Sequence, residues 1–267
     1  MSTPLGVQLY TFRTALSEDR AAALARTAEQ GFTAVEPFGI GGFGAEESER
    51  SKRLDNAKAL RGLLDSHGLN VVATHGSWST ASLPAVLEEV ATIGTSRLIA
   101  PVPGMVEGHG DAMKSVEGVQ RFAEALNAAA EVAASSGVQI GYHNHAFEWE
   151  TLEDGTSAYD ALVSRLDPRV FLEIDVYWAA TARQDPAQVI AAYADRVQLL
   201  HVKDGPAVQG ELQVPIGQGG VDNIAAIRAG HKVDCAIVEL DDCAGDPFDA
   251  ARTGGAWLVE QGVARWS

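Results

Sequence analysis

Acidic and imidazole side chains end several short apolar runs in the second half of this 267-residue chain. Carboxylates and imidazoles are common metal ligands and common general acids and bases in enzymes. Residues two apart in a strand share one face, so each run can send one ligand and one supporting group in the same direction. The pairs are Glu173 with Asp175, His201 with Lys203, and Glu239 with Asp241.

Further polar residues end the other apolar runs. A single acid at a strand end usually caps a helix, and a lone histidine usually lies on the surface or in the core. Many such groups at one place are costly to bury unless they are paired or bind something. Two or three carboxylates with one imidazole suit Mn²⁺ or Mg²⁺, with Co²⁺ and Zn²⁺ as alternatives. The additional residues are Gln8, Tyr10, Glu36, His75, Tyr142, His143, Asn144, His145 and Glu148.

A regular alternation of strands and helices carries these residues. Apolar, β-branched runs alternate with longer stretches rich in Ala, Leu and Glu. Gly31, Gly68, Gly94 and Gly137 each follow a helical stretch, where a left-handed residue commonly ends a helix. We expect strands at 5–12, 34–38, 71–75, 97–102, 138–144, 170–176, 197–203 and 236–240, and helices around 18–30, 54–67, 116–134 and 247–261.

Eight strand–helix units close most naturally into a (β/α)8 TIM barrel, whose active site lies at the carboxyl ends of the strands. A doubly wound open sheet is the alternative, but no GxGxxG opens a helix after the first strand. Because no linker splits the chain, we expect one barrel domain over residues 1–267. The Gly-rich and then charged stretch 39–53 is expected to be a mobile loop over the barrel mouth. The run Gly217–Gly220 either makes a turn or cradles an anion.

Composition narrows the choice of partners. The chain has 20 Lys and Arg against 36 Asp and Glu, a net charge of −16, which repels nucleic-acid phosphates. No apolar stretch approaches the roughly 20 residues of a membrane span, and the first residues lack a secretory pattern. We therefore expect a cytoplasmic protein without nucleic-acid or membrane partners. Cys235 and Cys243 are expected to be reduced thiols.

Six segments, in this order, resemble the sugar phosphate isomerase/epimerase family of xylose isomerase-like TIM barrels. That superfamily includes ketose 3-epimerases, inosose dehydratases, hydroxypyruvate isomerases and the endonuclease IV branch. Its members hold one divalent metal with a Glu, an Asp, a His and a second Glu. The resemblance implies that Asp175, His201 and Glu239 are the last three of these ligands. The segments are GVQLYTFR, GFTAVEPFG, IGYHNHAFEWE, FLEIDVYW, LLHVKD and IVELDD.

The chain departs from the ketose-epimerase pattern at the first metal ligand and at a position after the strand that carries Asp175. Tyr142 stands where those enzymes have the first Glu, so we expect Glu148 to be the ligand, with His143 as the fallback. Trp178 stands where they often carry a His. The YHNH and DVYW segments look more like relatives that act on inososes or 3-keto-glycosides by dehydration or bond cleavage. Because this ligand set is rich in oxygen and holds one imidazole, Mn²⁺ is the favoured metal.

The resemblance implies removal of a proton from a carbon next to a carbonyl, with a metal stabilising the enediolate. Glu239 is one candidate base, and His143 or His145 is another. Lys203 would neutralise an oxyanion or a phosphate; the alternative is a salt bridge to Asp204 or Glu173. Substrate contacts are expected from Glu36 and His75 to hydroxyl groups and from Tyr10, Phe38 and Trp178 as an apolar wall.

Several function classes follow from these features. The first is a metal-dependent isomerase or epimerase of a small keto-sugar or cyclitol, and its alternative is a lyase or dehydratase that uses the same proton abstraction. A phosphodiester-cleaving nuclease of this fold would be expected to have more histidine ligands and a basic face. A non-catalytic barrel subunit is the remaining class. Members of the superfamily are often dimers or tetramers, so the resemblance is compatible with a homo-oligomer.

Overall fold

The computed structural model describes residues 2–267, which divide into two compact units. The first unit comprises the described residues up to Phe38 together with Arg61–Val72 and Glu173–Ser267. The second unit comprises Gly39–Leu60 and Ala73–Leu172. Each unit contributes its own run of parallel strands with helices between them. No helix in the described residues is long and apolar enough to cross a membrane.

In the first unit, neighbouring strands run in the order β9-β10-β1-β2-β4, and β8 comes before β9. All the pairings in the β9-to-β4 series are parallel, and the strands are almost completely buried, as expected when helices cover a parallel sheet. Gln8 lies opposite Glu36 in the register of β1 and β2. The strands are β1 (Thr3–Gln8), β2 (Ala34–Glu36), β4 (Asn70–Val71), β8 (Phe171–Asp175), β9 (Val197–Val202) and β10 (Cys235–Val238), with β11 (Ala264–Arg265) paired to β1.

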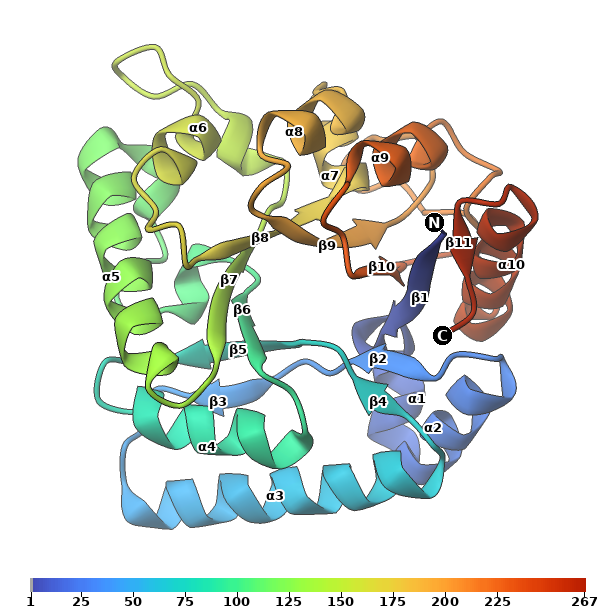
Figure 1. The fold of residues 1–267 in the computed structure, drawn as a ribbon, viewed down its shortest axis with the longest axis horizontal. Coiled ribbons are helices and arrows are strands. Elements are labelled where there is room, and N and C mark those ends of the chain that lie inside the picture. Colours follow the sequence, from blue (N-terminus) through green and yellow to red (C-terminus); the bar gives the residue numbers. More distant parts are fainter. Residues whose placement is uncertain (1) are drawn as a thin grey trace. The chain divides into compact units, whose positions relative to one another are not determined.

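Most α-helices of the first unit begin at an aspartate cap. The carboxylates of Asp19, Asp185, Asp222 and Asp246 each accept a hydrogen bond from a backbone N–H in the first turn of the helix that follows. Helices α8 and α9 pack against each other (Figure 1). The elements are η1 (Leu9–Phe12), α1 (Arg13–Glu18), α2 (Arg20–Glu29), α7 (Val176–Thr181), α8 (Pro186–Ala192), α9 (Asn223–Ala229) and α10 (Pro247–Glu260).

In the second unit, parallel strands run in the order β3-β5-β6-β7. Helix α5 packs on β7, and α4 packs on β3, β5 and β6. Helix α3 (Glu47–Ser66) starts in this unit and ends in the first. The other elements are β3 (Ile40–Gly42), β5 (Thr74–Trp78), β6 (Arg97–Ala100), β7 (Gln139–His143), α4 (Leu83–Ile93), α5 (Val116–Ala134), α6 (Ala158–Val163), η2 (Pro103–Met105), η3 (Ala112–Lys114) and η4 (Phe147–Trp149).

Most of the predicted elements are confirmed, with shifted ends. Helix 116–134 has the predicted bounds, and all four predicted helix-ending glycines have positive φ. The first predicted strand is too long, because its last four residues form the 3-10 helix η1. The helix predicted over 18–30 is α2, and the short helix α1 that precedes it was not predicted; Asp19 ends α1 and caps α2. The strand predicted over 71–75 is divided into two strands, β4 and β5.

The loop predicted over residues 39–53 is wrong. Residues Ile40–Gly42 form β3, and α3 begins at Glu47. The buried carboxylate of Glu89 organises this segment: it accepts hydrogen bonds from the Gly41 N–H at 3.1 Å and from Arg53 Nε at 2.6 Å. Both contacts join residues far apart in sequence, so they could not be predicted from the composition of residues 39–53.

Gly41 allows β3 to approach β5, and we predict that Gly41→Ala strongly destabilises the fold. Its φ is +84°, and an added Cβ would stand 2.2 Å from the Ser77 carbonyl oxygen. Gly39 is a matched control, with φ +71° and nothing within 4 Å of an added Cβ. Gly39→Ala should cost about 1–2 kcal/mol of unfolding free energy from the left-handed backbone alone, and Gly41→Ala clearly more. Urea unfolding measures both, and equal losses would contradict this prediction.

Candidate active site

The carboxyl ends of the first unit's strands place acids and bases together. Glu36 ends β2, and Glu173 and Asp175 lie at the end of β8. His201 lies on β9, followed by Lys203, and Glu239 follows β10. All of these side chains are buried, and the parallel order of the strands is what brings them to one end of the sheet.

His201 is clamped between carboxylates on both sides of its ring. Its Nδ1 lies 2.6 Å from Glu239 Oε2, and its Nε2 lies 2.7 Å from Glu36 Oε2 and 3.3 Å from Glu173 Oε2. Burial by itself lowers the pKa of this imidazole, but the charges of Glu173, Glu239 and Glu36 outweigh burial and raise the pKa well above its ordinary value. These contacts therefore favour the imidazolium and fix the orientation of the ring.

Glu36 is an orienting partner of His201. Its Oε2 also accepts a hydrogen bond of 2.7 Å from Gln8 Nε2, which the register of β1 and β2 places opposite. Glu36 and Gln8 are both completely buried. Such a partner behind a metal-ligating histidine holds the ring in place and raises its basicity. The expectation that Glu36 binds a substrate hydroxyl stays a prediction.

Lys203 lies among three carboxylates and is itself 1% exposed. Its Nζ is 2.9 Å from Asp175 Oδ2, 2.7 Å from Glu239 Oε2 and 2.9 Å from Asp241 Oδ2. Burial lowers the pKa of this ammonium, but these carboxylates outweigh burial and raise the pKa well above its ordinary value. The alternative partners expected from the sequence were wrong, because the chain folds these other three acids against the lysine.

Gln213 is a residue that sequence reasoning missed. Its Nε2 donates to Asp241 Oδ2 at 2.8 Å, and its Oε1 accepts from the Asp241 backbone N–H at 2.7 Å. The two bonds hold Asp241 beside Lys203. Gln213 lies in the long connection between β9 and α9, and no motif marks it. Only the structure reveals its role.

Asp204 explains the glycine-rich run. Its carboxylate accepts hydrogen bonds of 2.8–3.1 Å from the backbone N–H groups of Gly205, Gly217, Gly219 and Val221. The anion that this loop cradles is thus the chain's own side chain. Asp204 thereby anchors the connection that carries Gln213.

Asp175, His201 and Glu239 form a set that fits one divalent cation. Each offers a ligand atom within 4.8 Å of the others, and all three are buried. Two carboxylates and an imidazole match the donors that Mn²⁺, Co²⁺ or Zn²⁺ accept. Five carboxylates contact the two cations His201 and Lys203, so negative charge is in excess here and a divalent cation would offset part of it. Their assignment as metal ligands stays a prediction.

The second unit contains the remaining candidates. Glu148, in η4, is completely buried, and its carboxylate accepts hydrogen bonds from the Tyr142 hydroxyl at 2.7 Å and from the His145 backbone N–H at 2.9 Å. Burial, followed by the charge of Glu148, raises the pKa of Tyr142 well above its ordinary value. Glu148 thus holds the turn that follows β7. Its role as first metal ligand, and that of His143 as fallback, stay predictions.

Three histidines gather at the strand ends of the same unit. The ring centroids of His75 and His143 are 5.0 Å apart, and those of His143 and His145 are 5.1 Å apart. His75 and His143 are buried, and His145 is half-buried. The roles of His143 and His145 as bases and of His75 in substrate binding stay predictions.

The expected apolar wall lies in the first unit. The rings of Tyr10 and Phe38 meet edge to face at 5.1 Å, and Tyr10 is 39% exposed. The ring of Trp178 is half-buried, with the Lys203 ammonium 5.9 Å from its centroid. Aromatic faces beside charged groups are suited to a sugar ring, so these positions agree with the expected role without testing it.

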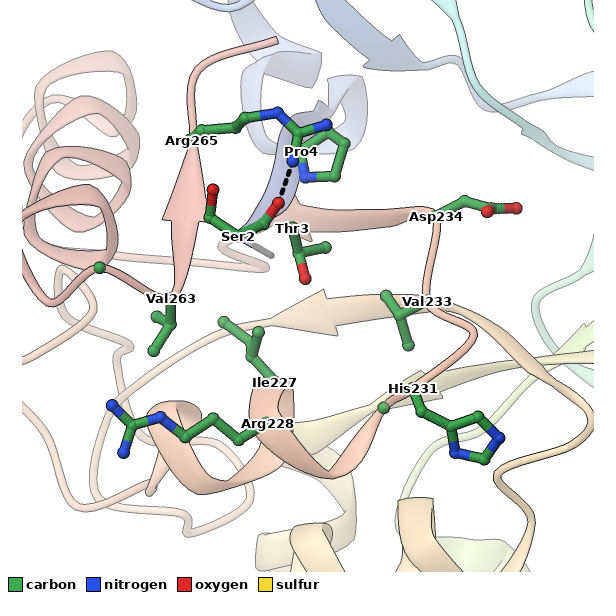
Figure 2. A pocket seen from close by; sticks show the side chains of 12 residues that line it. Ser2, Thr3, Pro4, Ile227, Arg228, His231, Val233, Asp234, Val263 and Arg265 are labelled. Carbon is green, nitrogen blue, oxygen red and sulfur yellow. Dashed lines mark hydrogen bonds between the residues drawn. The ribbon is translucent and has the colours of Figure 1, made fainter.

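A separate pocket of about 1000 Å³ lies in the first unit, by the end of α9 and the start of β1 (Figure 2). Arg265 donates a hydrogen bond to the Ser2 carbonyl at its edge. None of the residues predicted to form the active site borders this pocket. Its lining residues include Thr3, Pro4, Ile227, Arg228, His231 and Val233.

Metal binding should compete with protons at this site. His201 must lose its proton to bind a metal, and the neighbouring carboxylates raise the pKa of its imidazole, so this proton competes with the metal. Burial also raises the pKa of Asp175 to about 6, although Lys203 opposes this, so a second proton competes below that pH. The affinity for Mn²⁺ should therefore rise with pH and fall steeply below about pH 6. Isothermal titration in buffers of different ionisation enthalpy measures the released protons.

The control for this experiment is His231→Ala, because His231 is 59% exposed and stands apart from the cluster. That variant should show the same pH dependence as the unmodified chain. An affinity that stays constant between pH 5.5 and 8, with no proton release, would contradict the prediction.

The chain resembles known proteins in both sequence and fold. It is 31% identical over 86 residues to an inosose dehydratase of Geobacillus kaustophilus, an alignment that covers 32% of this chain and only 27% of that relative. A sugar phosphate isomerase/epimerase from Parabacteroides distasonis superposes with a TM-score of 0.79 at 23% identity, covering 99% and 96% of the two chains. The IolI protein with a bound zinc atom superposes with a TM-score of 0.65 at 15% identity, covering 97% of each chain.

A family model settles the fold class. The model described as xylose isomerase-like TIM barrel matches residues 24–260, which is most of the chain. This match confirms the (β/α)8 barrel expected from the alternation of strands and helices, and it excludes the doubly wound sheet. The chain therefore belongs to the xylose isomerase-like TIM barrel family.

Proposed function

We propose that this protein is a divalent-metal-dependent isomerase or epimerase of a small keto-sugar or cyclitol. The observation that carries the proposal is the buried cluster of Asp175, His201 and Glu239, with His201 held by Glu36 behind it. The sugar isomerase/epimerase with the same fold and the dehydratase relative support the substrate class. Mn²⁺ is the favoured metal, and the zinc atom bound in IolI, which has a similar fold, supports metal binding.

A metal bound by these residues supplies Lewis-acid stabilisation of negative charge that develops on a substrate oxygen. Glu239, whose carboxylate contacts both His201 and Lys203, takes the proton from the carbon next to the carbonyl. His143 or His145 is the alternative base. Lys203 brings a positive charge to the developing oxyanion. Return of the proton on the opposite face gives the epimer.

A second candidate is a lyase or dehydratase that begins with the same proton abstraction. The similarity to an inosose dehydratase specifically favours it. In this reaction the substituent on the carbon beyond the deprotonated carbon leaves after the proton is removed. The substrate thereby loses water or releases an alcohol. Because the first step is shared, the two candidates differ only in their products.

Solvent deuterium exchange tests the shared step. The chain is stripped with a chelator, reloaded with Mn²⁺ and incubated in D₂O with ketoses, inososes and 3-keto-glucosides. We expect deuterium at the carbon next to the carbonyl of at least one substrate, and only with metal present. NMR detects the label, and mass spectrometry separates an epimer of unchanged composition from a product that has lost water or an alcohol.

Matched variants sharpen this test. Asp175→Ala should abolish exchange, and Glu36→Gln should reduce exchange or metal affinity about 10- to 100-fold, as expected when the partner behind a ligating histidine is lost. His231→Ala, at an exposed histidine of the same unit, should leave exchange unchanged. Absence of metal-dependent exchange with every substrate class would overturn the proposed function.

A further inference from the structure

The ammonium of Lys203 contacts two of the proposed metal ligands directly. Asp175 Oδ2 lies 2.9 Å from Nζ, and Glu239 Oε2 lies 2.7 Å from it. The third contact, at 2.9 Å, is with Asp241 Oδ2, which is outside the proposed ligand set. The ammonium of Lys203 is therefore within ion-pair distance of all three carboxylates.

The individual oxygens show why these contacts matter. Asp175 Oδ1 accepts the Trp178 backbone N–H at 2.9 Å and thereby caps α7, so Oδ2 is the oxygen turned to Lys203. Glu239 Oε2 contacts both Lys203 Nζ and His201 Nδ1. A cation that binds Asp175 and Glu239 through these oxygens therefore meets the ammonium at the same place.

A divalent cation and the ammonium repel each other when both lie beside these oxygens in a buried site. Like charges a few ångströms apart repel strongly where the effective dielectric constant is low. The lysine side chain is long and flexible, so its ammonium can shift while its backbone stays in place. Asp241 offers the shifted ammonium a fixed partner, because Gln213 holds it with two hydrogen bonds and its side chain is 31% exposed.

We propose that Lys203 competes with the divalent cation for Asp175 and Glu239, and that Asp241 and Gln213 form the seat that its ammonium takes when the metal binds. Lys203 is then a positioning residue that keeps the carboxylates together and sets the affinity for the metal. The inference rests on the metal site of the proposed function and adds a residue that tunes the occupancy of that site.

The test is Mn²⁺ affinity, measured from the free-ion signal in electron paramagnetic resonance. Lys203→Met removes the competing cation and should tighten Mn²⁺ binding by about tenfold or more. Lys203→Gln should tighten it as well and keeps a hydrogen-bond donor beside the same carboxylates. Lys232→Met is the control, because Lys232 is an exposed lysine paired with Asp195, and it should bind Mn²⁺ like the unmodified chain.

Asp241→Asn provides the opposite arm. It should weaken Mn²⁺ binding severalfold, because the ammonium loses its alternative partner. In the Lys203→Met background, Asp241→Asn should change the affinity by less than about twofold, since a residue that acts through Lys203 has no effect without it. A loss of affinity that persists in the double variant would mean that Asp241 acts by its charge alone. That result would contradict the proposal that Asp241 receives the shifted ammonium of Lys203.

The outcomes separate this inference from the proposed function. Unchanged or weaker Mn²⁺ binding by folded Lys203→Met and Lys203→Gln overturns the inference, while metal-dependent deuterium exchange by the unmodified chain leaves the proposed function standing. If neither lysine variant folds, an Asp241→Asn chain that binds Mn²⁺ as tightly as the unmodified chain overturns it. Failure of every chain to bind Mn²⁺ overturns both.

Discussion

The buried charge balance around His201 and Lys203 is the constraint on which the rest of the site depends. These two cations contact five carboxylates, and four of the five are buried. Carboxylates at this depth are stable only when paired, because taking a charge out of water costs several kcal/mol per ion. His201 and Lys203 therefore stabilise the fold, because they allow acids from different strands to lie together at one end of the sheet.

The second level of organisation is the set of polar groups that hold these ions in place. Glu36 and Gln8, opposite each other on adjacent strands, fix one side of His201. The carboxylate of Asp204, bonded to four backbone N–H groups, anchors the connection after β9 from which Gln213 reaches Asp241. These internal hydrogen bonds hold the long loop between β9 and α9 in one conformation, and Gln213 in that loop holds Asp241 beside Lys203.

Membership of the xylose isomerase-like TIM barrel family explains the frame and leaves the chemistry to the side chains. One fold of this kind carries many reactions, because loops and strand ends vary independently of the barrel. In this chain, Tyr142 donates a hydrogen bond to Glu148 near the end of β7, and the backbone N–H of Trp178 in α7 donates to the capping carboxylate of Asp175.

The sequence by itself determined the alternation of strands and helices, the left-handed glycines that end helices, and the barrel class. Hydrophobic periodicity and capping residues depend on positions only a few residues apart, so they can be recognised in the sequence. Only the tertiary structure decided that Lys203 pairs with Asp175, Glu239 and Asp241, that Asp204 is the anion of the glycine-rich loop, and that Glu89 organises β3. Each of these contacts joins residues far apart in sequence. Their energies come from burial and charge neutralisation, which exist only after the strands have come together.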